Sequence, residues 1–238
     1  MATVVAGVDG CRAGWFAVLW DTEADSFVCQ VISDFAGVLA FASAAEVIAV
    51  DIPIGLLTQA LPGGRVCDVY ARKLLHPNRM SCVFSPPVRG TLEAATYPEA
   101  VAINRGSSHY DCALSKQCFG IIPKIREVDQ LMTAELQEKV REAHPEVCFH
   151  ALNRGTTLSQ AKRTPEGRAE RLKLLVQHGF APLLAQLLCS RVEGAAPDDV
   201  LDACATCWTA RRIAEGNAVR IPQEPHRDAC GLRMEMWY

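Results

Sequence analysis

The stretch TVVAGVDGCRAGWFAVLW, residues 3–20, decides the fold. Two runs of β-branched, aromatic and other apolar residues, 3–8 and 15–20, flank a short segment rich in glycine. Such runs bounded by Gly and Asp are typical of strands joined as a hairpin, with Asp9-Gly10 as the expected turn. A third run, 26–32, follows a segment of turn composition. The sequence therefore predicts that three antiparallel strands open the fold.

A helix and a buried strand are predicted next. Asp34 is a suitable N-cap for a helix that runs to about residue 44, and residues 46–51 (EVIAVD) have the apolar character of a buried strand. Later helices are expected over residues 65–76, 97–105, 123–140, 166–178 and 197–215, with a short one after His144-Pro145-Glu146. We expect a single α/β domain over residues 1–238, with a largely helical insertion at about 60–140.

Composition limits the class of protein. Half of the residues are hydrophobic and 21% are charged, which suffices for a sizeable core and excludes general disorder. The net charge of -3 provides no bulk attraction to nucleic acid, so such binding would need a local basic patch. Eleven cysteines without framework spacing favour a reducing, cytoplasmic location. The longest apolar stretch falls short of the ~20 residues that span a bilayer, so no membrane segment is expected.

Two aspartates, Asp9 and Asp51, follow apolar runs at the ends of expected strands. Ligands of open α/β sheets gather beyond the carboxyl ends of strands, and a carboxylate at the edge of an apolar core needs a partner that offsets its desolvation. For Asp9 alone a plain Asp-Gly turn is the simpler interpretation, and for Asp51 the two interpretations are level. Together, the pair favours a bound divalent cation.

Further carboxylates come from later segments. Asp199 and Asp202 are three residues apart and share one face of the last expected helix. The helix dipole explains acidic residues in the first turn but explains Asp202 poorly, so we expect Asp202 as a ligand and favour Asp199 over Asp198. Glu146 joins this set, although a carboxylate at that helix N-terminus is favoured without any ligand.

The donor types point to a hard metal ion. Several carboxylate oxygens with few nitrogens suit Mg²⁺ or Mn²⁺, whereas zinc would call for a cluster of Cys and His. The pair Cys204 and Cys207 lies within an expected helix and has no second CxxC, so we interpret it as packing.

Seven segments spread over nearly the whole chain form a recognisable pattern. They are GVDGCRAGWF (7–16), VDIPIGL (50–56), PKIREVD (123–129), HPEVCF (144–149), KRTPEGR (162–168), DDVLDA (198–203) and GLRMEMWY (231–238). This pattern resembles the DUF429 family, described as predicted ribonuclease H-like nucleases. The resemblance implies a ribonuclease H-like core, a five-stranded mixed sheet with an antiparallel meander followed by parallel strands and flanking helices. It is also similar to Holliday-junction resolvases, whose metal ligands would correspond to Asp9, Asp51, Asp199 and Asp202.

The resemblance implies a metal-dependent nuclease that hydrolyses phosphodiester bonds. In a two-metal mechanism the carboxylates hold ions about 3.5 to 4 Å apart, one activating water and the other stabilising the leaving oxygen. The catalytic residues would be Asp9, Asp51, Glu146, Asp199 and Asp202. Nucleic acid, as RNA, DNA or branched DNA, is the expected partner. Candidates for the cations that contact its phosphates are Arg12, Arg72, Lys124, Lys162 and Arg163.

Two other functions fit the same residues: a hydrolase or phosphatase of a small phosphorylated substrate, and a noncatalytic binding module that keeps the fold. A kinase or ATPase of this superfold would need two such domains, for which 238 residues scarcely suffice. The sequence leaves open the substrate and the oligomeric state, a homodimer included. It also leaves open whether His144 is a proton shuttle or a support for Glu146.

Overall fold

A five-stranded mixed sheet with the order β3-β2-β1-β4-β5 forms the centre of the protein in a computed structural model, which describes residues 3–189 and 192–238. The predicted meander is present as β1 (Val4–Cys11), β2 (Gly14–Asp21) and β3 (Ser26–Ile32). β4 (Val47–Val50) and β5 (Val140–Glu142) extend the sheet parallel to β1. The α/β class is therefore as predicted, and the architecture is compatible with a ribonuclease H-like fold.

Across the described residues, eight α-helices accompany the sheet. They are α1 (Phe35–Phe41), α2 (Val66–Leu74), α3 (Tyr97–Gly106), α4 (Lys116–Leu131), α5 (Pro145–Leu152), α6 (Pro165–Leu175), α7 (Ala181–Cys189) and α8 (Pro197–Ala214). A π-helical segment, Val176–Phe180, joins α6 to α7, and a small second sheet pairs β6 (Arg220–Ile221) with β7 (Met236–Trp237). No helix in this part of the chain is long and apolar enough to cross a membrane.

The β1–β2 hairpin is longer than the sequence suggested. The predicted turn at Asp9-Gly10 is wrong, because pairing continues past Asp9 to Cys11 opposite Gly14, and residues 12–13 form the turn. The Asp-Gly pair is a strong local turn signal, but the ladder with β2 overrides it. Asp9 is therefore an in-register strand residue, and a turn no longer explains its presence.

One predicted helix has the wrong boundaries. The structure has α4 at Lys116–Leu131 in place of residues 123–140, and β5 begins where that helix was expected to end. Ser115 starts α4, since its hydroxyl accepts a hydrogen bond from the N–H of Cys118 at 3.0 Å. Pro123 lies on the exposed side of the helix, where water can bind the carbonyl that its missing N–H leaves free. Proline was thus a misleading start signal.

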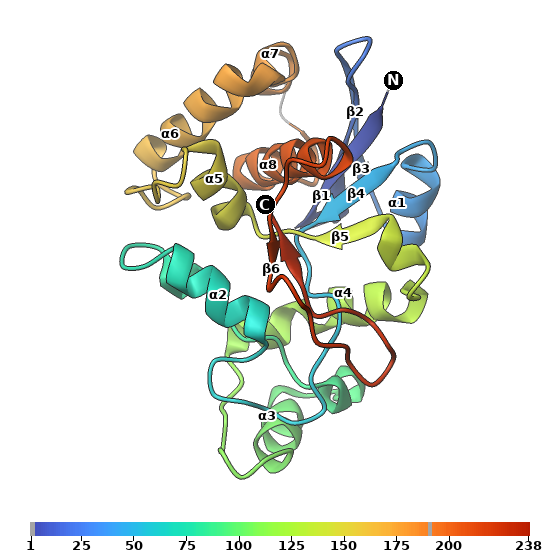
Figure 1. Ribbon diagram of the computed structural model, residues 1–238, viewed down its shortest axis with the longest axis vertical. Coiled ribbons are helices and arrows are strands. Elements are labelled where there is room, and N and C mark those ends of the chain that lie inside the picture. The colour runs from blue at the N-terminus through green and yellow to red at the C-terminus, as the bar shows by residue number, and fades with distance from the viewer. Residues whose placement is uncertain (1–2, 190–191) are drawn as a thin grey trace.

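Helices cover both faces of the central sheet (Figure 1). α1 and α4 pack on the face to which Ala6 and Val8 of β1 point. α5, α7 and α8 pack on the opposite face, to which Val5 and Cys11 point. Because successive strand residues alternate between faces, Asp9 points to the same side as α8. Figure 1 shows α2 and α3, from the segment between β4 and β5, on the side of the molecule away from α7.

Candidate functional site

The sheet brings Asp9 and Asp51 together. Val8 of β1 pairs with Val50 of β4, so the residues that follow them lie on neighbouring strands, which are ~4.8 Å apart. The N–H of Asp51 donates to the carbonyl of Val8 at 3.0 Å, which continues the pairing beyond β4. Both side chains point to the face that α8 covers, because each lies two residues beyond one that packs on that side.

A close contact between α8 and β1 supplies the third carboxylate. A Cβ atom on Gly7 would lie 2.5 Å from the Cα of Cys207 and would overlap the backbone of Ala203. The helix therefore packs directly on the strand backbone. Asp202 lies beside this contact and is 1% exposed, and Asp9, two residues along β1 from Gly7, is 7% exposed.

Asp202 is bound through one oxygen only. Its Oδ2 accepts a hydrogen bond from Nζ of Lys162 at 2.7 Å. Its Oδ1 is buried and has no hydrogen-bond partner among the residues that the structure describes. Leaving a buried carboxylate oxygen without a partner is costly. This oxygen therefore marks a position that a cation or a hydrogen-bond donor can fill.

Burial raises the pKa values of the three carboxyl groups, and repulsion by neighbouring carboxylates adds to this effect. For Asp9 burial has the largest effect on the pKa, followed by the charges of Asp51 and Asp202. Burial also raises the pKa of Asp51, and it raises that of Asp202 to about 6 against the opposing charge of Lys162. Although burial opposes the charged form of Lys162, the neighbouring carboxylates raise the pKa of its ammonium. Such a cluster favours the binding of a cation.

Asp199 lies at the margin of this cluster. Its Oδ2 accepts a hydrogen bond from the N–H of Ala196 at 2.8 Å, which caps the start of α8. Its charge nevertheless contributes to the raised pKa of Asp9. The structure therefore brings Asp199 near the other aspartates while giving it a second role in the helix.

Glu146 is neutralised by two arginines. Its Oε1 lies 2.9 Å from Nη2 of Arg79 and 2.5 Å from Nη2 of Arg171. Burial opposes ionisation of Glu146, but these two guanidinium groups hold the pKa of the carboxyl below its ordinary value. In this structure Glu146 joins α5 to α6 and acts on Asp51 only through its charge.

His144 caps α5. Its Nδ1 accepts a hydrogen bond from the N–H of Glu146 at 3.2 Å, and its Nε2 lies 3.3 Å from the carbonyl of Cys82. Both ring nitrogens therefore have partners. Of the two roles that the sequence leaves open, these contacts favour support for Glu146.

A cavity of about 580 Å³ opens beside the carboxylates. Its wall includes Asp51 and Asp202 together with three cationic side chains, Arg79, Lys162 and Arg163. Of the expected phosphate-binding residues, the structure therefore brings Lys162 and Arg163 to the acidic cluster. Arg163 is exposed at this cavity.

The other three expected phosphate-binding residues do not line this cavity, although the charge of Lys124 acts on Asp199. Arg12 is exposed in the β1–β2 turn, where it lines a separate hollow with Asp199. Lys124 donates to the carbonyl of Gly14, and its ammonium lies 4.5 Å from the centre of the Trp15 ring. Arg72 of α2 donates to two backbone carbonyls, those of Gly63 and Val83, and lines a different hollow.

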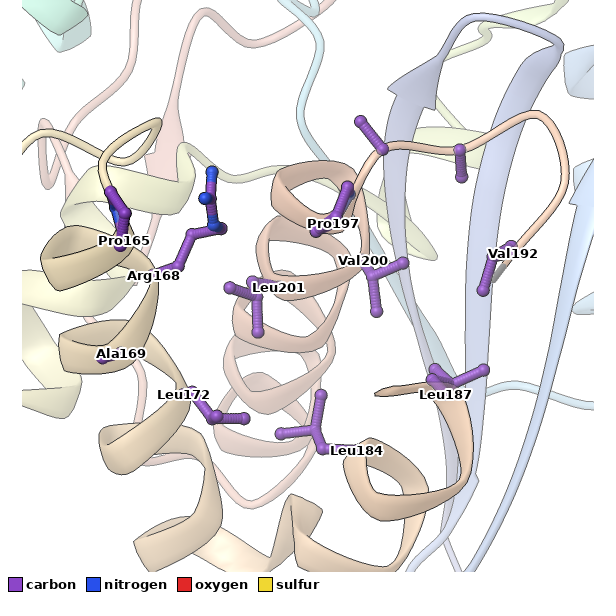
Figure 2. Close-up of a pocket in the computed structure, with 12 residues that line it drawn as sticks. Pro165, Arg168, Ala169, Leu172, Leu184, Leu187, Val192, Pro197, Val200 and Leu201 are labelled. Atoms are coloured by element: carbon purple, nitrogen blue, oxygen red, sulfur yellow. The ribbon is translucent and has the colours of Figure 1, made fainter. Parts of the chain in front are cut away.

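An apolar groove of about 840 Å³ lies on the other side of α8 (Figure 2). Figure 2 shows Leu201 of α8 above Leu172 of α6 and Leu184 of α7, with Val200 of α8 on the side of Leu187 and Val192. The first turns of α8 thus present aspartates to the acidic cluster and apolar side chains to this groove.

One known family accounts for nearly the whole chain. The family model described as "Protein of unknown function (DUF429)" matches residues 7–227. The chain belongs to the DUF429 family. Neither the curated proteins nor the solved structures contain a match. The part of this DUF429 protein that the family model covers contains all three clustered aspartates and Lys162.

A buried ion-pair network with no signal in the sequence holds the loop after Asp51 in the DUF429 protein. Arg65, 2% exposed, contacts Asp68 at 2.8 Å and Glu142 of β5 at 2.5 Å. Glu142 also accepts a hydrogen bond from the N–H of Ile54 at 2.7 Å. Arg65 and Glu142 are 77 residues apart, so no local pattern could have revealed their contact.

The acidic cluster fits a divalent cation in its chemistry. Three carboxylates offer the oxygen donors that Mg²⁺ and Mn²⁺ prefer, and the unpartnered Oδ1 of Asp202 is free to bind one. Within residues 3–189 and 192–238, no group of three or more His, Cys, Asp or Glu is arranged to hold a metal ion as it stands. The ammonium of Lys162 hydrogen-bonds Asp202, and its positive charge also acts on Asp9 and Asp51.

Proposed function

We propose that this DUF429 protein is a metal-dependent nuclease of the ribonuclease H-like type, which hydrolyses phosphodiester bonds. The observation that carries the proposal is the buried Oδ1 of Asp202 beside Asp9 and Asp51, which has no hydrogen-bond partner among the described residues. These three aspartates would hold Mg²⁺ or Mn²⁺, with Asp199 at the edge of the set.

The proposed chemistry is the attack of water on a phosphodiester. A bound divalent cation would activate water and stabilise the leaving oxygen. In the reaction the water oxygen bonds to phosphorus, the bond from phosphorus to the leaving oxygen breaks, and a proton passes from the water to the leaving oxygen. Lys162 and Arg163 line the wall of the cavity, and in this proposal their charges attract the phosphate oxygens.

The experiment compares cleavage of labelled RNA, DNA and branched DNA by the purified chain in Mn²⁺, in Mg²⁺ and in chelator. We expect cleavage that needs the metal and that Asp51→Asn abolishes. Glu166→Gln, which neutralises an exposed carboxylate at the start of α6, is the matched control and should cleave like the wild type. Cleavage that persists in Asp51→Asn or in chelator would overturn the proposal.

A second candidate function is the hydrolysis of a small phosphorylated substrate. It is favoured because several of the cationic side chains are already bound to other groups of the protein. Lys162 is bound to Asp202, Arg79 to Glu146, and Lys124 to a backbone carbonyl. Tight binding of a duplex draws on several phosphate contacts, whereas a cavity of about 580 Å³ is of the size that holds a small molecule. Metal-dependent turnover of small phosphoesters without cleavage of any nucleic acid would favour this candidate. Metal binding without either activity would favour a noncatalytic module.

A further inference from the structure

Lys162 contributes a positive charge to the cluster of aspartates through its contact with Asp202. Its Nζ lies 2.7 Å from Oδ2 of Asp202, and its charge also acts on Asp9 and Asp51. Asp202 is 1% exposed, whereas the lysine side chain is 37% exposed. The ammonium thus reaches from the cavity wall into the buried cluster.

The backbone around Lys162 is fixed to the first turn of α6. The Thr164 hydroxyl donates to the carbonyl of Ala161 at 2.9 Å and accepts from the N–H of Gly167 at 3.0 Å. A Cβ atom on Gly167 would lie 2.6 Å from the carbonyl carbon of Ala161, so the loop and the helix are in direct backbone contact. This packing limits the movement of the loop that carries Lys162.

α6 is in turn fixed to the helix beside the cluster. Arg171 of α6, 1% exposed, donates to Glu146 of α5 at 2.5 Å and to the carbonyl of Gly167 at 3.0 Å. The position of the lysine relative to Asp202 therefore depends on buried contacts rather than on a free surface side chain. Lys162 is therefore held at the site by the fold.

The two oxygens of Asp202 are then distinct. Oδ2 is occupied by the ammonium, and Oδ1 is the one left for a metal ion. One divalent cation together with the ammonium balances the charge of Asp9, Asp51 and Asp202. Asp199 at the edge adds one negative charge, and its Oδ2 is held by the N–H of Ala196. Even with Asp199 counted, a second divalent cation would leave an excess of positive charge and would repel Lys162.

We propose that the site binds a single divalent cation through Asp9, Asp51 and Oδ1 of Asp202, and that the Lys162 ammonium takes the place of a second ion. This inference rests on the proposed function and departs from the two-ion site that the family resemblance implies. An ammonium is a compact point charge with three donors, so it can offer a phosphate oxygen the attraction that a second ion would offer.

The experiment counts bound Mn²⁺ per chain from the EPR signal of free Mn²⁺ during titration. We expect one ion per chain in the wild type and in Lys162→Arg, which keeps the charge. Lys162→Met removes the charge and frees Oδ2 of Asp202, so it should bind two ions. Lys173→Met, which removes an exposed charge on α6, is the matched control and should bind one.

The possible counts separate this inference from the proposed function. Two ions in the wild type, or one ion in Lys162→Met, would overturn the role of Lys162 and leave a metal-dependent hydrolase intact. No bound Mn²⁺ in the wild type would overturn the proposed function itself. The number of Mn²⁺ ions bound by the wild type can be measured whether or not any variant folds. Thermal unfolding of each variant in chelator shows whether its Mn²⁺ count was obtained on a folded chain.

Discussion

A Cβ atom added to Gly7 of β1 would lie 2.5 Å from the Cα of Cys207 in α8. The helix and the strand thus touch through their backbones, with no side chain between them. Asp202 lies little more than one helical turn before Cys207, and Asp9 lies two residues beyond Gly7. The contact between strand and helix therefore sets how closely these two carboxylates approach.

We expect Gly7→Ala to weaken the fold and the metal site together. The added methyl group meets backbone atoms, so only a movement of α8 away from β1 can relieve the overlap. Overpacking of this kind costs about 1–3 kcal/mol, and the displaced Asp202 should weaken Mn²⁺ binding by about tenfold or more. Urea denaturation and the EPR titration measure the two effects.

Gly120→Ala is the control for this substitution. Gly120 lies on the exposed side of α4, and a Cβ atom there would have nothing within 4 Å. The change should stabilise the protein by roughly 0.5–1 kcal/mol, because alanine favours a helix over glycine. If Gly7→Ala matched this control in stability and Mn²⁺ affinity, α8 could not rest on β1 as described.

Asp202→Asn should change how stability depends on pH in metal-free buffer. Burial raises the pKa of Asp202 to about 6 from an ordinary value of 3.8. As pH rises from 3.8, the unfolded chain ionises this group first, so its contribution to wild-type stability falls until the folded pKa is passed. The difference between these pKa values corresponds to about 3 kcal/mol of unfolding free energy, which the wild type loses as pH rises. Asp202→Asn does not lose it, because Asn does not titrate.

The measurement is urea denaturation of both proteins in chelator between pH 4 and 7. The stability of Asp202→Asn relative to wild type should rise by up to about 3 kcal/mol over this interval and stay level above it. Taking the difference between the two proteins cancels the titration of shared carboxyl groups away from the cluster. Asp9, whose pKa the charge of Asp202 raises, contributes to the difference with the same sign, because the substitution removes that charge. A difference that is flat with pH would contradict a raised pKa for Asp202.

Local sequence signals predicted the elements whose ends depend on local chemistry. Asp34 caps α1 as expected, with its Oδ1 accepting a hydrogen bond from the N–H of Gly37 at 2.7 Å. The apolar runs also predicted β2, β3 and β4 closely. The turn at Asp9-Gly10 failed because pairing with β2 outweighs turn propensity. β5 has only three residues, and its place depends on β4 rather than on its own composition.

The candidate site divides in the same way. The alternation of strand residues and the equivalent places of Asp9 and Asp51 were visible in the sequence, so their proximity follows from register. The partners of the other carboxylates were not visible. Lys162 is 40 residues from Asp202, and Arg79 is 67 residues from Glu146. When two charged residues are so far apart along the chain, the sequence does not distinguish them from ordinary surface residues. Their pairing becomes visible only in the folded structure.

Glu146→Gln should test whether Glu146 is a metal ligand or an ion-pair partner. Since Arg79 and Arg171 occupy its carboxylate, we expect Mn²⁺ affinity to fall by less than about tenfold, or 1.4 kcal/mol. Asp51→Asn should weaken it by more. A loss of Mn²⁺ affinity in Glu146→Gln as large as that in Asp51→Asn would make Glu146 a ligand.

Arg171→Met should destabilise the protein by breaking a buried ion pair. Arg171 is 1% exposed, and its removal leaves the buried Glu146 with Arg79 alone. Breaking one side of a buried pair costs about 3–5 kcal/mol, and the double variant with Glu146→Gln should recover part of that loss. Urea denaturation of the two single variants and the double variant gives the coupling. Strictly additive losses would show that the pair does not act as a unit.

Arg163 and Arg72 should differ in their effect on nucleic-acid binding. Arg163 is exposed beside the acidic cluster, whereas the Arg72 guanidinium already donates to the carbonyls of Gly63 and Val83. Each phosphate contact contributes about 0.9 to the slope of log binding constant against log salt for duplex DNA, and about 0.7 for single strands. Arg163→Ala should therefore reduce the slope by the amount that about one phosphate contact contributes, and Arg72→Ala should leave the slope unchanged. Fluorescence anisotropy in the Asp51→Asn background measures binding without cleavage. An equal reduction in both variants would mean that the slope reflects net charge rather than a phosphate held at the acidic cluster.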